Sequence, residues 1–195
     1  MMKRLMILIL LIIPVMTIAQ RFKGGIVAGL NASQIEGDYT GGYNKAGIVA
    51  GAFVTTEFRS NWGGLMEIRY AEKGSSIPLD DDVRRKIRLQ YIEMPVLATY
   101  DIANKFQGQA GVSIGYLFRE SQNEGTGYED FDRYDDFEVA ASLGMNYRVF
   151  DKLSMNIRLS FSIIPIYQQY PGAMDLDYAS FNNVLSFTAY YRIGR

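Results

Sequence analysis

The chain has 195 residues, no cysteine, no histidine and a formal net charge of −1 at pH 7. The lack of cysteine excludes a disulfide framework and a thiolate metal site, and the lack of a basic excess argues against a nucleic-acid-binding protein. A chain of this length fits one domain.

The first 19 residues have the pattern of a secretory signal peptide. Lys3 and Arg4 precede an apolar run, Leu5–Ile18, and the run ends in small residues at Thr17 and Ala19. The alternative is a membrane anchor, but the run is shorter than the roughly 20 apolar residues that span a bilayer, and it contains Pro14. We therefore expect residues 1–19 to be removed and residues 20–195 to form one domain.

The rest of the chain alternates between apolar residues and small or polar residues in eight segments. A period of two is typical of strands with two unlike faces. In chain order the predicted strands are 23–31, 46–58, 64–74, 87–100, 107–119, 137–148, 153–167 and 184–193. In the strand 107–119, the apolar face ends in Tyr116 and Phe118, and the opposite face is small or polar. Such strands are long enough to cross a bilayer at a tilt.

The predicted connections alternate in length. The long ones are 32–45, 75–86, 120–136 and 168–183, and the short ones are 59–63, 101–106 and 149–152. Long loops at one end and tight turns at the other are typical of outer-membrane barrels, whose short turns face the periplasm. Aromatic residues near the strand ends are expected to form two girdles: Phe58, Trp62, Tyr70, Tyr100, Tyr116, Phe118, Tyr147 and Tyr191.

Charged residues fall on the face opposite the bulky apolar residues. This arrangement predicts an all-β, eight-stranded antiparallel up-and-down transmembrane β-barrel with lipid outside and a polar, plugged lumen. The alternative is a soluble secreted small-ligand-binding β-barrel, which would turn its charged face to water. In the membrane barrel, inward acids and bases pair with one another. The expected lumen charge cluster consists of Glu57, Glu67, Arg69, Glu93 and Arg158.

The sequence argues against catalysis. Outer-membrane deacylases, phospholipases, proteases and palmitoyltransferases need a histidine, and this chain has none. A carboxylate pair such as Glu67 and Glu93 has the chemistry to act on a sugar, but ion pairing inside the lumen is the favoured interpretation. An eight-stranded barrel is also too narrow for an open porin channel, and a slow, narrow path for water or ions is the alternative that stays open. We therefore expect no enzyme activity and no cofactor.

The segment 120–136 is rich in acidic residues, and a cation-binding loop is one interpretation, because clustered carboxylates suit hard cations. It lacks the spacing of a calcium-binding loop, and a solvated loop is the favoured interpretation, so no metal site is predicted. The candidate residues are Glu129, Asp130, Asp132, Asp135 and Asp136.

Short motifs lie along the first five predicted strands: Gly25–Ser33, Gly47–Gly51, Glu67–Gly74 and Tyr91–Pro95, with Ala110-Gly111 and Gly115-Tyr116 in the fifth strand. In their order and spacing these segments resemble the PorT-like outer-membrane β-barrel proteins of the Bacteroidota. The resemblance implies an eight-stranded antiparallel barrel over nearly the whole exported chain. One namesake acts in type IX secretion, and that role is not carried over to this chain.

The resulting expectation is a non-enzymatic, monomeric protein of the outer membrane. Its expected partners are outer-membrane lipids, the outer-membrane insertion machinery and a protein of the envelope or cell surface, with no nucleic acid. The expected roles are envelope structure, surface interaction or an accessory function in a secretion or envelope complex.

Overall fold

The computed structural model of the protein describes residues 22–37, 42–58, 60–78, 84–123, 127–130, 133–168 and 179–193. The predicted signal peptide, residues 1–19, lies outside the described residues. No helix in the described part of the chain has the length and apolar character needed to cross a membrane.

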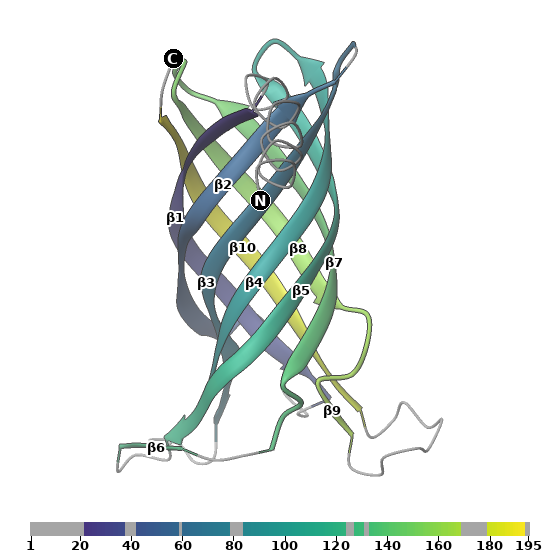
Figure 1. The fold of residues 1–195 in the computed structure, drawn as a ribbon. Helices are drawn as coiled ribbons and strands as arrows, with labels where there is room; N and C mark the ends of the chain where they lie inside the picture. Colours follow the sequence, from purple (N-terminus) through teal and green to yellow (C-terminus); the bar gives the residue numbers. More distant parts are fainter. Residues whose placement is uncertain are drawn as a thin grey trace, which may run out of the picture.

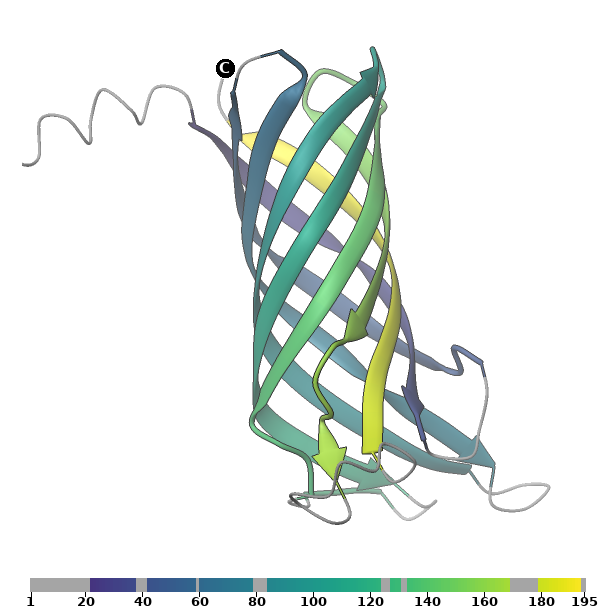
Figure 2. The ribbon, with the colours of Figure 1, turned by 90° about the vertical axis from the view of Figure 1, so that its right-hand side faces the viewer.

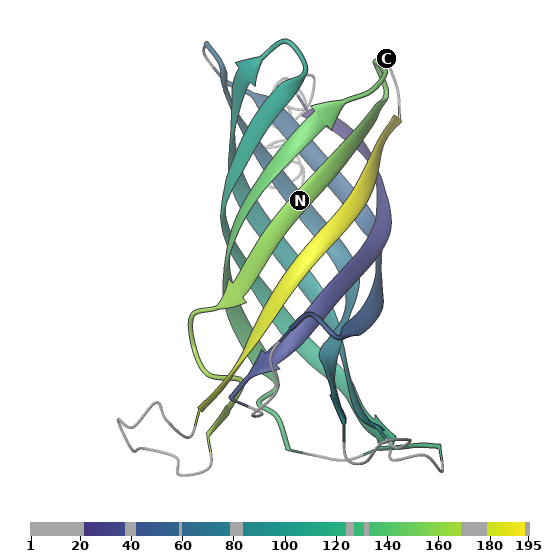
Figure 3. The ribbon, with the colours of Figure 1, turned by 180° about the vertical axis from the view of Figure 1, so that it is seen from behind.

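Eight long strands form a closed antiparallel barrel (Figure 1). They are β1 (Phe22–Glu36), β2 (Lys45–Glu57), β3 (Trp62–Pro78), β4 (Arg84–Ala103), β5 (Phe106–Asn123), β7 (Phe137–Arg148), β8 (Leu153–Ser162) and β10 (Ala179–Ile193). Each strand pairs with its neighbour in this order, and β1 also pairs with β10, with Ala28 opposite Ala189. Figure 3 shows this seam, where the yellow β10 lies beside the purple β1. The predicted eight-stranded barrel is confirmed.

The two faces of each strand differ in exposure as the alternation predicts. On β8, the side chains of Ile157, Leu159 and Phe161 point outward, and these residues are 45 to 50% exposed. Arg158 and Ser160, between them, are 1% and 5% exposed and face the lumen. The predicted orientation, with apolar residues outside and ionic residues inside, is therefore confirmed.

Aromatic side chains form two levels on the outer wall. Near the short turns, Trp62 packs against Tyr100 on the neighbouring strand, and Phe106 packs likewise against Tyr147. At the other level the packed pairs are Tyr70 with Phe118 and Tyr116 with Phe137. Paired aromatic levels match the girdles that flank the apolar band of a transmembrane barrel. We call the end with short turns the turn end and the opposite end the loop end.

Several strands continue further toward the loop end than the alternation predicts. Strands β1, β3, β4, β5 and β10 take in segments that the alternation assigns to loops, namely residues 32–36, 75–78, 84–86, 120–123 and 179–183. Figures 1 and 2 show β4 and β5 passing the level at which β8 ends. Two short strands, β6 (Tyr128–Asp130) and β9 (Tyr167–Gln168), add to the edges of β5 and β10.

The prediction that the strand beginning at residue 153 runs to residue 167 is wrong. β8 ends at Ser162, and the chain bends before β9 begins at Tyr167. Pro165 lies in the bend, and a proline has no N–H to donate to a strand ladder. The bend directs Ile166, which is fully buried, toward the inside of the barrel.

Glycines on the inner face let neighbouring strands and inward side chains approach closely. A Cβ on Gly51 would lie 2.2 Å from the backbone oxygen of Ile68 and 2.6 Å from the Cα atom of Arg69, the residue opposite in the ladder. The missing side chain therefore leaves space for the Arg69 side chain to enter the lumen.

Candidate functional site in the barrel lumen

Six buried charged side chains form a continuous chain across the middle of the lumen. We call this set the ionic layer, and it consists of Glu67, Arg69, Lys73, Glu93, Glu138 and Arg158. Acids and bases alternate along it. Arg158 forms a salt bridge with Glu67 at 2.7 Å. Arg69 forms salt bridges with Glu67 at 3.2 Å and with Glu93 at 2.9 Å. Lys73 forms salt bridges with Glu93 and with Glu138, the latter at 2.7 Å.

The strand register places these side chains together. Glu67, Arg69 and Lys73 lie on the inner face of β3, and Glu93 lies opposite Arg69 on β4. Arg158 comes from β8, on a distant part of the sheet, and reaches Glu67 across the lumen. Contacts across the lumen of this kind are available only in a barrel narrow enough for side chains to fill it.

Polar neighbours complete the hydrogen bonding of the layer. Tyr190 donates its hydroxyl hydrogen to Glu67 at 2.6 Å and accepts a hydrogen bond from Arg158 at 2.9 Å. The Gln109 side-chain oxygen also accepts from Arg158, and Ser162 donates to Glu138. Three acids balance three bases, so the layer carries no formal net charge. Buried charges need such pairing to offset their desolvation.

The layer has the geometry of a structural plug. Each of its three carboxylates already contacts at least one cationic group, and all of its members are at most 4% exposed. A general acid or base must be within hydrogen-bond reach of a substrate. The Glu67 and Glu93 carboxylates are enclosed by protein groups, and Arg69 bridges the two.

Four of the five residues predicted to form the lumen cluster meet in this layer: Glu67, Arg69, Glu93 and Arg158. Placing Glu57 in the cluster is wrong. It ends β2 at the turn end, its side chain is 71% exposed, and it pairs with Lys23 at 2.5 Å. Lys73 and Glu138, which the predicted cluster omits, complete the layer. Both lie at inward positions of their strands, but their contact spans 65 residues of sequence and depends on the fold.

The lumen is less uniformly polar than the alternation predicts. An apolar cluster of Val27, Phe53, Leu65, Leu97 and Tyr190 lies on the inner face. A second cluster contains Ile35, Ile87, Leu89, Tyr91, Leu117, Tyr134 and Ile166. Its members come from strand segments near the loops and from two of the connections. Apolar packing therefore fills part of the interior.

Two connecting segments fold over the loop end of the lumen, and we call residues 133–136 and 163–167 the cover. The Asp135 N–H donates to the Ile166 carbonyl at 2.8 Å, and the Leu117 N–H donates to the Asp136 carbonyl at 2.7 Å. Glu120 accepts hydrogen bonds from the N–H groups of Arg133 and Tyr134. Side chains of the cover belong to the second apolar cluster, so the lumen is closed here by protein.

The acidic candidates in the segment 120–136 do not gather into a cation site in the part that the structure describes. Glu129 and Asp130 lie on β6, and Asp130 pairs with Arg119 at 3.1 Å. Asp135 and Asp136 belong to the cover, and Asp132 lies outside the described residues. Among the described residues, no group of three or more acidic side chains is placed to hold a metal ion.

Comparisons with known proteins agree with this architecture. Residues 18–168 match the family described as outer membrane protein beta-barrel domain. The fold is similar to that of Ail, the attachment invasion locus protein of Yersinia pestis, with a TM-score of 0.50 and 14% identity over 88% of this chain and 98% of Ail. It is also similar to Neisserial surface protein A, with a TM-score of 0.53 and 10% identity over 88% of this chain and 96% of that protein. At these identities the likeness shows the fold alone. No curated protein sequence matches the chain.

Proposed function

Because the chain belongs to the outer membrane protein beta-barrel domain family, we propose that it is a non-enzymatic, non-conducting barrel that presents a sheet to a protein partner at the cell surface. The observation that carries this proposal is the unequal height of the barrel wall. The β5–β7 ladder ends where Tyr116 faces Phe137, whereas the β4–β5 ladder continues to Lys86 and Asn123. Residues 117–123 of β5 thus extend the wall by about 20 Å along the strand.

The outer surface of this extension has the chemistry of a region outside the lipid. Beyond the aromatic pair of Tyr70 and Phe118, outward positions carry charge. Arg88 contacts Glu72 at 3.2 Å, and Arg119 pairs with Asp130. Charged side chains on the lipid face of a barrel are costly at the midplane and tolerated near the interfaces. The extended parts of β3, β4 and β5, with β6, therefore form an emergent sheet that is available to a partner.

The blocked lumen supports a role other than transport. The ionic layer fills the middle of the barrel, and the cover closes its loop end. An ion or solute that crossed the barrel would have to pass through both the ionic layer and the cover. A surface interaction would involve the emergent sheet, and the filled lumen would serve as its rigid support.

The remaining parts of the proposal concern the envelope. The protein is exported by the signal peptide of residues 1–19, inserted by the outer-membrane insertion machinery, and surrounded by outer-membrane lipid as a monomer. Its Gly25–Ser33 and Glu67–Gly74 segments support a PorT-like relationship. An accessory place in a secretion or envelope complex is the second role that fits a barrel with an emergent sheet. The soluble ligand-binding barrel is not favoured, because the outward residues of β8 would expose a continuous apolar surface to water.

Cysteine labelling of intact cells tests the proposed orientation and exposure. The chain has no cysteine, so each introduced thiol is the only one. Glu129→Cys lies on exposed β6, and Asn104→Cys lies in the exposed turn between β4 and β5. With a membrane-impermeant maleimide, we expect Glu129→Cys to react on intact cells and Asn104→Cys to react only after the outer membrane is permeabilised.

A buried control and a conductance measurement complete the test. Ser160→Cys faces the lumen and should stay unlabelled in both conditions. Planar-bilayer recordings of the purified protein should show no steady channels. Labelling of Asn104→Cys alone on intact cells, recovery of the protein in a soluble periplasmic fraction, or steady conductance would each contradict the proposal.

A further inference from the structure

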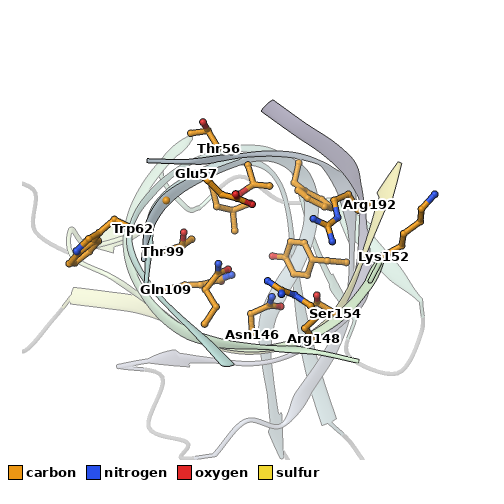
Figure 4. Close-up of a pocket in the computed structure, with 16 residues that line it drawn as sticks. Thr56, Glu57, Trp62, Thr99, Gln109, Asn146, Arg148, Lys152, Ser154 and Arg192 are labelled. Atoms are coloured by element: carbon orange, nitrogen blue, oxygen red, sulfur yellow. The ribbon is translucent and has the colours of Figure 1, made fainter. Parts of the chain in front are cut away.

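A small cavity opens into the lumen at the turn end, on the far side of the ionic layer from the cover. It has a volume of about 90 Å³, and inward side chains from several strands line it (Figure 4). Thr99, Gln109, Asn146 and Ser154 form much of its polar wall. Tyr190, which bonds to the ionic layer, also lines the cavity. The cavity is therefore a cup closed by the ionic layer and open to the compartment that faces the turns.

Two arginines give the cup a positive charge. Arg148 ends β7 and Arg192 lies near the end of β10, on either side of β8, and both side chains point into the cup in Figure 4. Lys152 also lines the cavity, but its side chain points away from it in the same view. The one acid in the lining, Glu57, is bonded to Lys23 and also attracts Arg192 and Arg148 electrostatically, so an incoming anion would share these arginines with it. A concave site with low-dielectric walls concentrates the potential of such charges.

The side chains of the cup have hydrogen-bonding capacity to spare. Within the described residues, neither Arg148 nor Arg192 forms an ion pair, and the Arg192 side chain donates to the backbone oxygen of Asp151. The Asn146 side-chain oxygen is buried and has no hydrogen-bond partner. Rotating this amide exchanges its oxygen and nitrogen and would present an N–H₂ donor to the cavity.

We propose that this cup binds a small oxyanion, a carboxylate or a phosphate, between the guanidinium groups of Arg148 and Arg192. Guanidinium groups bind such anions through paired, charge-assisted hydrogen bonds. The cavity is small, with a volume of about 90 Å³, so it suits one anionic group rather than a whole nucleotide or oligosaccharide. A larger ligand would therefore enter by a terminal anionic group and leave its remainder in the turn-side compartment.

Titration of the folded, isotope-labelled protein in a non-ionic detergent tests this proposal by NMR. Detergents with phosphate head groups would compete for the site and are avoided. Inorganic phosphate should produce saturable shifts of the amide signals of Asn146 and Ser154. The variant Arg148→Gln/Arg192→Gln should weaken binding by about tenfold or more, because it removes both charged donors that would hold the anion. Arg148→Lys/Arg192→Lys should retain part of the affinity.

Matched controls separate the site from general charge attraction. Arg119→Gln removes an exposed arginine at the loop end and should leave the titration unchanged. Heat-modifiable gel mobility establishes that each variant is folded. Shifts that rise linearly without saturation, or that persist equally in the double glutamine variant, would overturn the proposal.

The source of the anion is distinguished by comparing three probes. A short peptide with a free carboxyl terminus, the same peptide amidated, and inorganic phosphate are titrated separately. Tighter binding of the free-carboxyl peptide than of phosphate supports the site and identifies a peptide terminus as its ligand class. Tighter binding of phosphate supports the site and identifies the inorganic ion. Equal binding of the amidated and free peptides, with no response to phosphate, contradicts an oxyanion site.

Discussion

The lumen and the outer wall of this barrel are built from alternate residues of the same strands, yet in the middle of the described strands the charged side chains gather on the lumen side. On β8, Arg158 is buried among partners from other strands, and its neighbour Leu159 faces outward. Whether a charged side chain can be buried therefore depends more on a counter-charge within bonding distance than on how far the side chain lies from water. Inside, each charge has a counter-charge within bonding distance, whereas lipid offers none.

The largest expected effect comes from removing one member of the ionic layer. Arg158→Met should lower the free energy of unfolding by about 3–5 kcal/mol, because it leaves Glu67 buried without its main partner. Urea unfolding of the barrel in lipid vesicles measures this change. The double variant Glu67→Leu/Arg158→Met should recover much of the loss, since it removes both charges. A double variant less stable than the single one would show that the layer does not act through charge pairing.

Charge placed on the outer wall is the converse test. Leu159→Arg should destabilise the barrel by about 2–4 kcal/mol if the residue lies near the bilayer midplane. Ile193→Arg, at the turn-side end of β10, should cost only about 0–1 kcal/mol, because lipid-face costs fall toward the interface. Ser160 faces the lumen, so Ser160→Arg should disturb packing inside the barrel without exposing a charge to lipid. Equal costs at Leu159 and Ile193 would contradict the assigned depth.

Adding a methyl group to the inner wall should have an intermediate effect. Gly51→Ala brings a Cβ within 2.2 Å of the Ile68 backbone oxygen, so the β2–β3 ladder must shift. Overpacking of this kind costs about 1–3 kcal/mol. Gly24→Ala is the matched control, since its Cβ would meet its nearest neighbour, the Phe53 oxygen, at 3.6 Å. Equal urea midpoints for the two variants would contradict close packing at Gly51.

The smallest effect is expected at Glu57, the acid that lies outside the ionic layer. Glu57→Gln breaks its pair with Lys23, in which the two side chains are 71% and 37% exposed. Exposed pairs contribute about 0–1 kcal/mol, and salt screens them. Unfolding in low and high salt should show a loss within this range that shrinks as salt is added. A loss of unfolding free energy as large as that caused by Arg158→Met would contradict the placement of Glu57 outside the ionic layer.

The sequence alone predicted the strands, their orientation and the girdles, because a period of two is a local property that each segment carries by itself. The sites at which it failed depend on neighbours that are distant in sequence. Pro165 ends β8 early, yet only the folded chain shows Ile166 filling the lumen.

The sequence by itself determined that charges face inward and apolar side chains face outward along eight strands. Only the tertiary structure decided which charges meet: Arg158 reaches Glu67 from across the barrel, Lys73 joins Glu93 to Glu138, and Glu57 stays at the rim. The physical reason is that alternation assigns a side chain to a face. The ladder register and closure of the barrel then set its height and its partners across the lumen.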